Sequence, residues 1–124
     1  MSRPIKFRAW FTPKKKMYGV ASLSWLGIEH TLRLLSDEHP HEVFASDVVL
    51  MQFTGLLDRH GKEIYEGDVL EETEEGSVRG TVSFQRGCYI VDYGKRGVYH
   101  VDDRLGYLPQ IIGNRYEHPH LVQP

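Results

Sequence analysis

Hydrophobic and polar residues alternate with a period of two along much of the chain. In residues 77–85 (SVRGTVSFQ), Val78, Gly80, Val82 and Phe84 fall on one side and polar residues on the other. Successive side chains of a β-strand point to opposite faces, so this pattern predicts a half-buried strand of an antiparallel sheet.

Three further segments carry strand patterns. Residues 5–10 alternate in the same way, and residues 48–53 (VVLMQF) place apolar side chains on one face. Residues 88–93 (CYIVDY) are apolar on both faces, which predicts a strand in the centre of a small barrel. Secondary structure with a period of two therefore dominates the chain.

Short segments rich in glycine and charge separate these strands. The segment DRHGK has the length of a hairpin loop, and Gly61 can adopt the left-handed conformation that such a loop needs. Similar turn signals lie at residues 12–16, 74–77, 93–97 and 102–106. Many short strands with such turns predict an all-β fold, or a mainly β fold with short helical turns. We expect a small, twisted antiparallel barrel or pseudo-barrel that forms a single domain over residues 1–124.

Residues 24–40 fit two patterns. Their apolar residues can be placed on one helical face, yet Leu32 and Leu34 also alternate with polar neighbours, as on a strand. In a helix, Gly27 would fall in the first turn, where it is unfavourable. We predict a hairpin that turns at Leu26 and Gly27, and the helix stays open as the alternative.

Charge and cysteine content narrow the class of protein. The net charge is −2, whereas a dedicated nucleic-acid binder usually has a basic excess, although a local basic patch is compatible with this total. The only cysteine, Cys88, cannot form an internal disulfide, which favours a reducing compartment. The sequence shows neither a signal peptide nor an apolar run long enough to span a membrane. We therefore expect a cytoplasmic protein.

Histidines are the first candidates for chemistry. The tetrapeptide EHPH occurs at residues 38–41 and 117–120, and histidines two apart on an extended backbone can chelate a transition metal. Each pair brackets a proline in loop-like sequence, and no established metal-binding spacing supports it. We expect exposed loop histidines rather than a metal site. The four histidines concerned are His39, His41, His118 and His120.

The remaining reactive side chains also have plain structural interpretations. Cys88 lies in an apolar strand, where a thiol behaves as a small core residue. The acidic run at residues 71–75 lacks the spacing of a calcium loop, so we expect a solvated hairpin tip. No phosphate-binding glycine loop and no nucleophile elbow occur. We therefore expect no catalytic residue, no cofactor and no enzymatic activity.

A mixture of cations and aromatics at the N-terminus is the strongest chemical signal. Three of these residues share one face of the first predicted strand, and three lysines follow in the adjacent turn. Single-strand nucleic-acid binders on small β-barrels combine such residues, because bases stack on rings and phosphates pair with cations. Ordinary surface cations and a charged hairpin tip are the alternative. The candidate nucleic-acid-binding residues are Lys6, Arg8, Trp10, Lys14, Lys15 and Lys16.

Residues 50–70, LMQFTGLLDRHGKEIYEGDVL, resemble the hallmark segment of the YopX family of bacteriophage and prophage proteins. The resemblance extends to residues 5–20, 80–91 and 111–122 and is weakest from 24 to 47. It implies a mostly β, barrel-like fold and an association with phages. The molecular function of the family is unknown, so the resemblance transfers no catalytic residue.

Three positions depart from the family's usual pattern. His118 and His120 stand where family members more often have Asn and Glu, which counts against a metal role. Phe11 stands where an acidic residue is commoner.

We predict a small non-enzymatic phage or prophage protein, acting as a protein-interaction or self-assembling module. Its partner would be another copy, giving a homo-oligomer, or a phage or host protein, because short strands leave sheet edges for pairing. The first alternative is a barrel protein that binds single-stranded nucleic acid. The second is a metal-dependent enzyme that uses the histidines.

Overall fold

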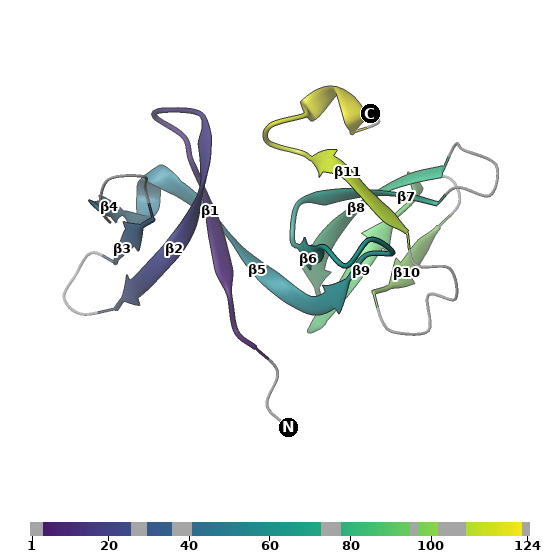
Figure 1. The fold of residues 1–124 in the computed structure, drawn as a ribbon, viewed down its shortest axis with the longest axis horizontal. Helices are drawn as coiled ribbons and strands as arrows, with labels where there is room; N and C mark the ends of the chain where they lie inside the picture. The colour runs from purple at the N-terminus through teal and green to yellow at the C-terminus, as the bar shows by residue number, and fades with distance from the viewer. Residues whose placement is uncertain are drawn as a thin grey trace. The chain divides into compact units, whose positions relative to one another are not determined.

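The computed structural model describes residues 4–25, 30–35, 41–72, 78–94, 97–101 and 109–122. Within these ranges the chain forms strands in two antiparallel sheets (Figure 1), so the predicted mainly β antiparallel fold is confirmed. One sheet contains β1 (Phe7–Phe11), β2 (Lys16–Ser24), β3 (Thr31–Leu34), β4 (His41–Phe44), β5 (Val48–Leu57) and β6 (Glu63–Tyr65). The other contains β7 (Asp68–Glu72), β8 (Val78–Gln85), β9 (Cys88–Asp92), β10 (Val98–His100) and β11 (Gln110–Asn114). Two 3₁₀ turns, η1 (Ala45–Asp47) and η3 (Pro119–Leu121), are also described.

The chain divides into two compact units. Residues 5–52 form the N-terminal unit, and the described residues from Phe53 onward, with Pro4, form the C-terminal unit. Strand β5 therefore begins in one unit and ends in the other. The organisation as a single domain over residues 1–124 stays a prediction.

The N-terminal unit is built on antiparallel neighbours in the order β4-β3-β2-β1-β5. Its fully buried side chains include Ala9 on β1 and Leu32 and Leu34 on β3. Strands β2 and β3 pair antiparallel, so the predicted hairpin strands are confirmed and the helical alternative is wrong for the described residues. The predicted turn at Leu26 and Gly27 lies outside the described residues.

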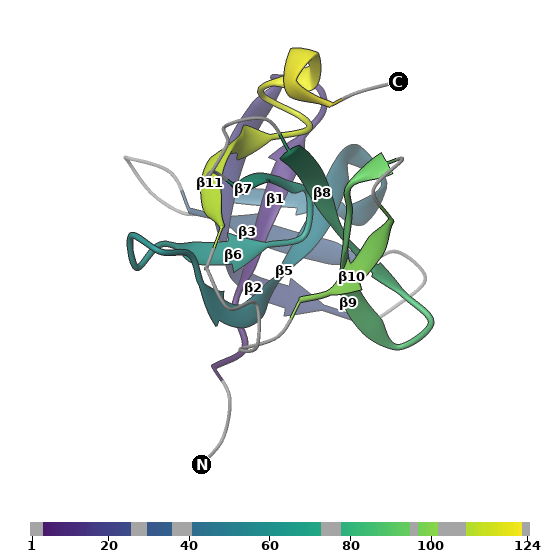
Figure 2. The same cartoon turned by 90° about the vertical axis from the view of Figure 1, so that its right-hand side faces the viewer.

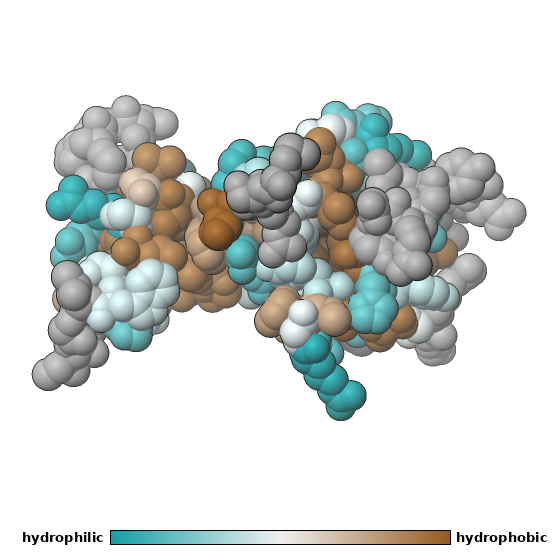
Figure 3. Space-filling view, turned by 90° about the horizontal axis from the view of Figure 1, so that it is seen from below, coloured by the Kyte–Doolittle hydropathy of each residue, from teal (hydrophilic) through white to brown (hydrophobic). Residues whose placement is uncertain are grey.

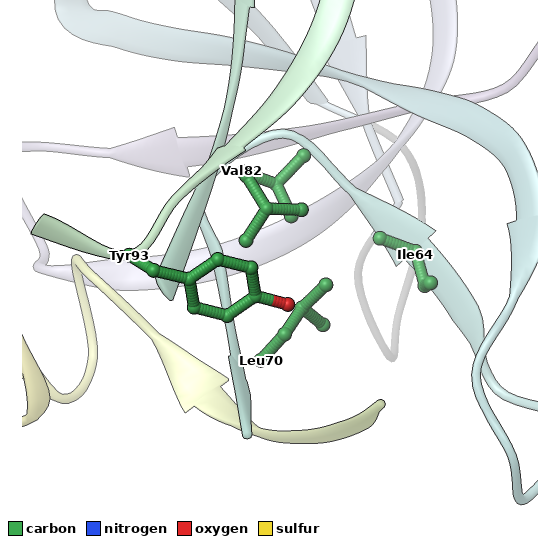
Figure 4. Packing of buried hydrophobic residues seen from close by; sticks show 5 residues of the cluster. Ile64, Leu70, Val82 and Tyr93 are labelled. Atoms are coloured by element: carbon green, nitrogen blue, oxygen red, sulfur yellow. The ribbon is translucent and has the colours of Figure 1, made fainter. Parts of the chain in front are cut away.

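The C-terminal unit contains a sheet in the order β10-β9-β8-β7-β11, which Figure 2 shows from the side of these strands. Strand β9 lies between β8 and β10 and buries Ile90 and Val91, which point to opposite faces, as predicted for a central strand. The core cluster of this unit contains Ile64, Leu70, Val82, Val91 and Tyr93, four of which are labelled in Figure 4.

The loop between β5 and β6 contains a buried carboxylate. The Oδ1 atom of Asp58 accepts hydrogen bonds from the backbone N–H groups of His60, at 2.8 Å, and Lys62, at 2.9 Å. Its Oδ2 atom accepts one from the N–H of Ile111 on β11, at 3.0 Å. Gly61 adopts a φ of 81°, so it takes the predicted left-handed position. Asp58 therefore organises its own loop and ties that loop to a strand far along the chain.

A second buried carboxylate shapes the next turn. The Oδ2 atom of Asp68 accepts a hydrogen bond from the N–H of Tyr65, at 2.7 Å. Ile64 and Val69 are buried on either side of this turn. The stretch FTGLLDRHGKEIYEGDVL, rich in acidic and basic groups, is thus a structural segment of the C-terminal unit.

The predicted turns at residues 74–77 and 102–106, and part of the turn at 93–97, lie outside the described residues. In the part of the chain that the structure describes, no helix has the length and apolar character needed to cross a membrane.

Gly80 on β8 should tolerate no side chain. A Cβ atom there would lie 2.6 Å from Val91 Cγ1, 2.7 Å from Tyr93 Cδ1 and 2.9 Å from the backbone oxygen of Asp92. We expect Gly80→Ala to lower the free energy of unfolding by about 1–3 kcal/mol, since overpacking shifts well-packed neighbours. Urea denaturation measures this loss. In the control Gly87→Ala, the added Cβ meets no atom within 4 Å and only the backbone at φ +81° is strained. A Gly80→Ala protein as stable as the parent would contradict the packing described above.

Asp58 should make stability depend on pH in the acid range. Burial raises the pKa of its carboxyl, but hydrogen bonds from Ile111, Lys62 and His60 and the nearby His60 side chain outweigh burial and lower the pKa below its ordinary value of 3.8. The stabilisation of the folded state by the Asp58 carboxylate is therefore fully present above pH 3.8. It is lost as the pH falls through the lowered pKa of Asp58 in the folded protein.

Asp58→Asn should lower the free energy of unfolding at pH 7 by about 1–3 kcal/mol, because its amide NH2 group would face the Ile111 N–H in place of the Oδ2 atom that accepts that hydrogen bond. The difference from the parent should narrow in acid. Urea titrations between pH 2 and 7 test this, with Asp92→Asn as the control, because exposed Asp92 accepts the Gly94 N–H at the surface. Parallel pH profiles for the parent and Asp58→Asn would show that the carboxylate does not have this role.

Candidate functional site

The six candidate nucleic-acid-binding residues all lie in or beside the β1–β2 hairpin of the N-terminal unit. Lys6 is exposed just before β1, and Arg8 and Trp10 are half-buried on β1. Lys14 and Lys15 are exposed in the turn, and Lys16 is exposed at the first position of β2. All six residues therefore lie in or beside one hairpin, as the sequence predicts.

The strand register divides these residues between two faces. Arg8 pairs with Gly19 and Trp10 with Met17, whereas Lys16 pairs with Phe11. Side chains directly opposite each other lie on the same face, and neighbours along a strand lie on opposite faces. Lys16 therefore lies on the face opposite to Arg8 and Trp10, with the turn lysines at the end of the hairpin.

On its own face Lys16 meets a group of rings that sequence reasoning did not bring together. Phe11, Tyr18 and His41 form what we call the aromatic cluster. Their ring centroids are 6.3 Å apart for Phe11 and Tyr18, 6.2 Å for Phe11 and His41, and 5.8 Å for Tyr18 and His41. All three pairs meet edge to face, the arrangement that aromatic quadrupoles favour.

The charge of Lys16 lies over this cluster. Its Nζ atom is 5.4 Å from the centroid of the Tyr18 ring, within the range of a cation–π contact. The three rings are half-buried, whereas Lys16 is exposed. The cluster thus consists of partly exposed aromatic residues beside an exposed positive charge.

The hairpin is also electrostatically distinct from the chain as a whole. Residues 5–24 contain five lysine and arginine residues and no aspartate or glutamate, although the net charge of the chain is −2. Such a local excess attracts anions even when the total charge is negative.

The prediction of exposed loop histidines is wrong for two of the four EHPH residues, because His41 is half-buried on strand β4 and His118 is half-buried as well. His41 belongs to the aromatic cluster, His120 is exposed as expected, and His39 lies outside the described residues. His118 is half-buried, and its Nδ1 atom accepts a hydrogen bond from the N–H of Asn114 at 3.2 Å. Over the described ranges, no three His, Cys, Asp or Glu side chains form a group that could hold a metal ion.

The other reactive side chains lie in structural settings. The apolar neighbours of Cys88 predicted a place in the core. The structure instead places Cys88 half-buried beside the turn of the β8–β9 hairpin. Glu71 and Glu72 are paired rather than simply solvated: Glu71 Oε2 lies 3.5 Å from Arg79 Nε, and Glu72 Oε1 accepts a hydrogen bond from the Tyr93 hydroxyl at 3.3 Å. Burial, and then the Glu72 carboxylate, raise the pKa of Tyr93 well above its ordinary value.

Exposed apolar side chains also lie on strands β8 and β10 of the C-terminal sheet. Phe84 on β8 and Val98 and Tyr99 on β10 are 52%, 54% and 52% exposed. Phe84 contacts Tyr89 across the β8–β9 pair, with ring centroids 5.0 Å apart. Figure 3 shows that hydrophobic side chains reach the surface among polar ones on one face of the molecule. The register places Phe84, opposite Tyr89, and Tyr99, opposite Val91, on one face of the sheet. Val98, opposite Asp92, lies on the other face of the edge strand β10. We refer to Phe84, Val98 and Tyr99 as the apolar rim.

Comparisons with known proteins place the chain in a family. The family model described as YopX protein matches residues 6–123. The fold is similar to the crystal structure of protein EF1440 from Enterococcus faecalis, with a TM-score of 0.66 and 25% identity over 98% of this chain and 100% of that chain. It is also similar to the X-ray crystal structure of protein yopX from Bacillus subtilis, with a TM-score of 0.64 and 23% identity over 96% of each chain. No match was found among curated proteins. Because the family model covers almost the whole sequence, this chain belongs to the YopX family.

Proposed function

We propose that this chain is a non-enzymatic, phage- or prophage-encoded protein of the host cytoplasm that assembles with a second copy of itself through the apolar rim. Membership of the YopX family supports the phage association. The observation that carries the proposal is that Phe84 on β8 and Val98 and Tyr99 on the last strand, β10, are each more than half exposed.

The chemistry of the rim favours a protein partner. Exposed apolar and aromatic side chains that gather in one place are typical of interaction surfaces, and aromatic residues are enriched there. Strand β10 is the last strand in the order of its sheet and contains neither a charged residue nor a proline. Charge and proline are the usual means by which proteins prevent pairing at such strands.

A second copy is the simplest occupant. In a two-fold dimer the same patch lies on both sides of the interface, so an apolar patch is complementary to itself. Antiparallel pairing of β10 with β10 of the second copy would place the two rims together. A phage or host protein that adds a strand at this position is the other partner this surface would accept.

Substitution in the rim should weaken self-association. We expect the parent protein to be oligomeric by sedimentation velocity. Phe84→Glu should raise the dissociation constant of the oligomer at least tenfold, because it places a charge in an apolar interface. Phe44→Glu is the matched control: Phe44 is also 52% exposed, but it lies on β4 of the N-terminal unit. A parent protein that stays monomeric at high concentration would end the proposal, as would equal effects of the two substitutions.

Single-stranded nucleic-acid binding is a second candidate function, favoured by the charge of the β1–β2 hairpin. Five cations without a carboxylate in residues 5–24 match the phosphates of a flexible strand. The aromatic cluster beside Lys16 supplies rings on the same hairpin and on β4. Cations and aromatics together are the means by which such proteins hold a strand without reading its sequence.

Binding through the hairpin should depend on salt. For an oligothymidylate, the logarithm of affinity should fall linearly with the logarithm of salt concentration, by about 0.7 per phosphate contact. Replacing Lys14 and Lys15 together by Gln should reduce the slope by about 1.4 if each pairs with one phosphate. Fluorescence anisotropy measures both quantities, and Lys62→Gln, an exposed lysine of the C-terminal unit, is the control. Undetectable binding at low ionic strength would remove this candidate.

A further inference from the structure

We propose that the aromatic cluster, with Lys16, is a stacking site for a base of single-stranded nucleic acid, on the face opposite to Trp10. The inference rests on the nucleic-acid binding proposed above as the second candidate function. It deepens that function, because it assigns the base contact to residues other than those the sequence indicated.

The position of the rings is the first argument. Phe11, Tyr18 and His41 come from three different strands, and each ring meets both of the others edge to face, which restricts the rotamers open to it. Preorganised rings lose little conformational entropy when a ligand binds. Every nucleobase has a π face, so stacking on such rings tolerates any base sequence.

The accessibility of the rings is the second argument. The core of the N-terminal unit is closed: Ala9 and Leu34 are 0% exposed and Leu32 is 3% exposed. The three rings instead remain half-buried, and part of their surface faces water. They are therefore better placed to receive a planar ligand than the residues of the sealed core.

The placement of charge is the third argument. Lys16 Nζ lies over the Tyr18 ring, and the exposed Lys14 and Lys15 continue from it through the turn. A nucleic-acid strand with one base stacked on the Tyr18 ring would bring its phosphates close to the ammonium groups of these lysines. Lys16, released from the ring, would then pair with the phosphate nearest the stacked base.

The register excludes Trp10 from this site. Trp10 pairs with Met17, and Lys16 pairs with Phe11, so the tryptophan and the aromatic cluster lie on opposite faces of the sheet. Arg8 shares the face of Trp10. A base stacked on Trp10 would thus lie away from Lys16, and this difference allows the two faces to be tested separately.

The test compares two oligomers with the same number of phosphates, oligothymidylate and an oligomer of abasic sites, with the full chain by fluorescence anisotropy. We expect the parent to prefer the thymidylate by about tenfold, in the range of one stacked base. Tyr18→Leu should abolish the preference, and Tyr18→Phe should keep it because the ring remains. Lys16→Gln, at an exposed position, should weaken binding of both oligomers and lower the salt slope. Phe44→Leu, which removes an exposed ring on β4 outside the aromatic cluster, is the control.

The outcomes separate the inference from the function on which it rests. If both oligomers bind equally and with a normal salt slope, nucleic-acid binding stands and the stacking site is wrong. If Trp10→Leu rather than Tyr18→Leu removes the preference, the base contact belongs to the other face. If neither oligomer binds at low salt, both proposals fail. Thermal unfolding of Tyr18→Leu, compared with Tyr18→Phe, shows whether a loss of binding comes from a loss of folding.

Discussion

Antiparallel register is the constraint on which the described structure depends. Each pair of strands fixes which side chains share a face, and a slip of one residue would move every side chain to the other face. In the β1–β2 pair, the opposition of Ala9 and Tyr18 buries the alanine and leaves Lys16 beside the rings. In the β8–β9 pair, the opposition of Val82 and Val91 buries both residues, and the opposition of Phe84 and Tyr89 continues the same face to the surface. Both candidate surfaces therefore extend from faces that the register also uses for the core.

Buried carboxylates complete the frame of the C-terminal unit. Asp58 and Asp68 are each only 2% exposed, and both accept hydrogen bonds from backbone N–H groups. A buried charge is tolerable only when it is paired or well hydrogen-bonded, and here the loop backbone supplies the donors. Asp58 and Asp68 thus hold turns through their hydrogen bonds to the backbone. A segment dense in polar residues contributes to the architecture in this way.

Local patterns predicted much of the fold, because alternation and turn chemistry act over a few residues. The strand at 78–85 and the loop at 58–62 with its left-handed Gly61 follow from neighbours in sequence. The bond from Ile111 to Asp58 joins residues 53 positions apart, and no local signal indicates it. The site shows the same limit. The basic hairpin is visible in the sequence, but the face of Lys16 depends on its pairing with Phe11, and His41 reaches the cluster only through the order of the strands.

The hydrogen bond between His118 and the backbone of Asn114 bears on how this position can vary. The acceptor is Nδ1, so the imidazole carries its proton on Nε2. The side chain therefore supplies a hydrogen-bond acceptor atom two bonds from Cβ. The Oδ1 atom of an asparagine stands at the same topological distance from its backbone and offers a lone pair as well. Asparagine is the residue that the YopX resemblance leads one to expect at this position. Histidine and asparagine differ in charge and shape, but at this position both can accept the same backbone hydrogen bond through their δ atom.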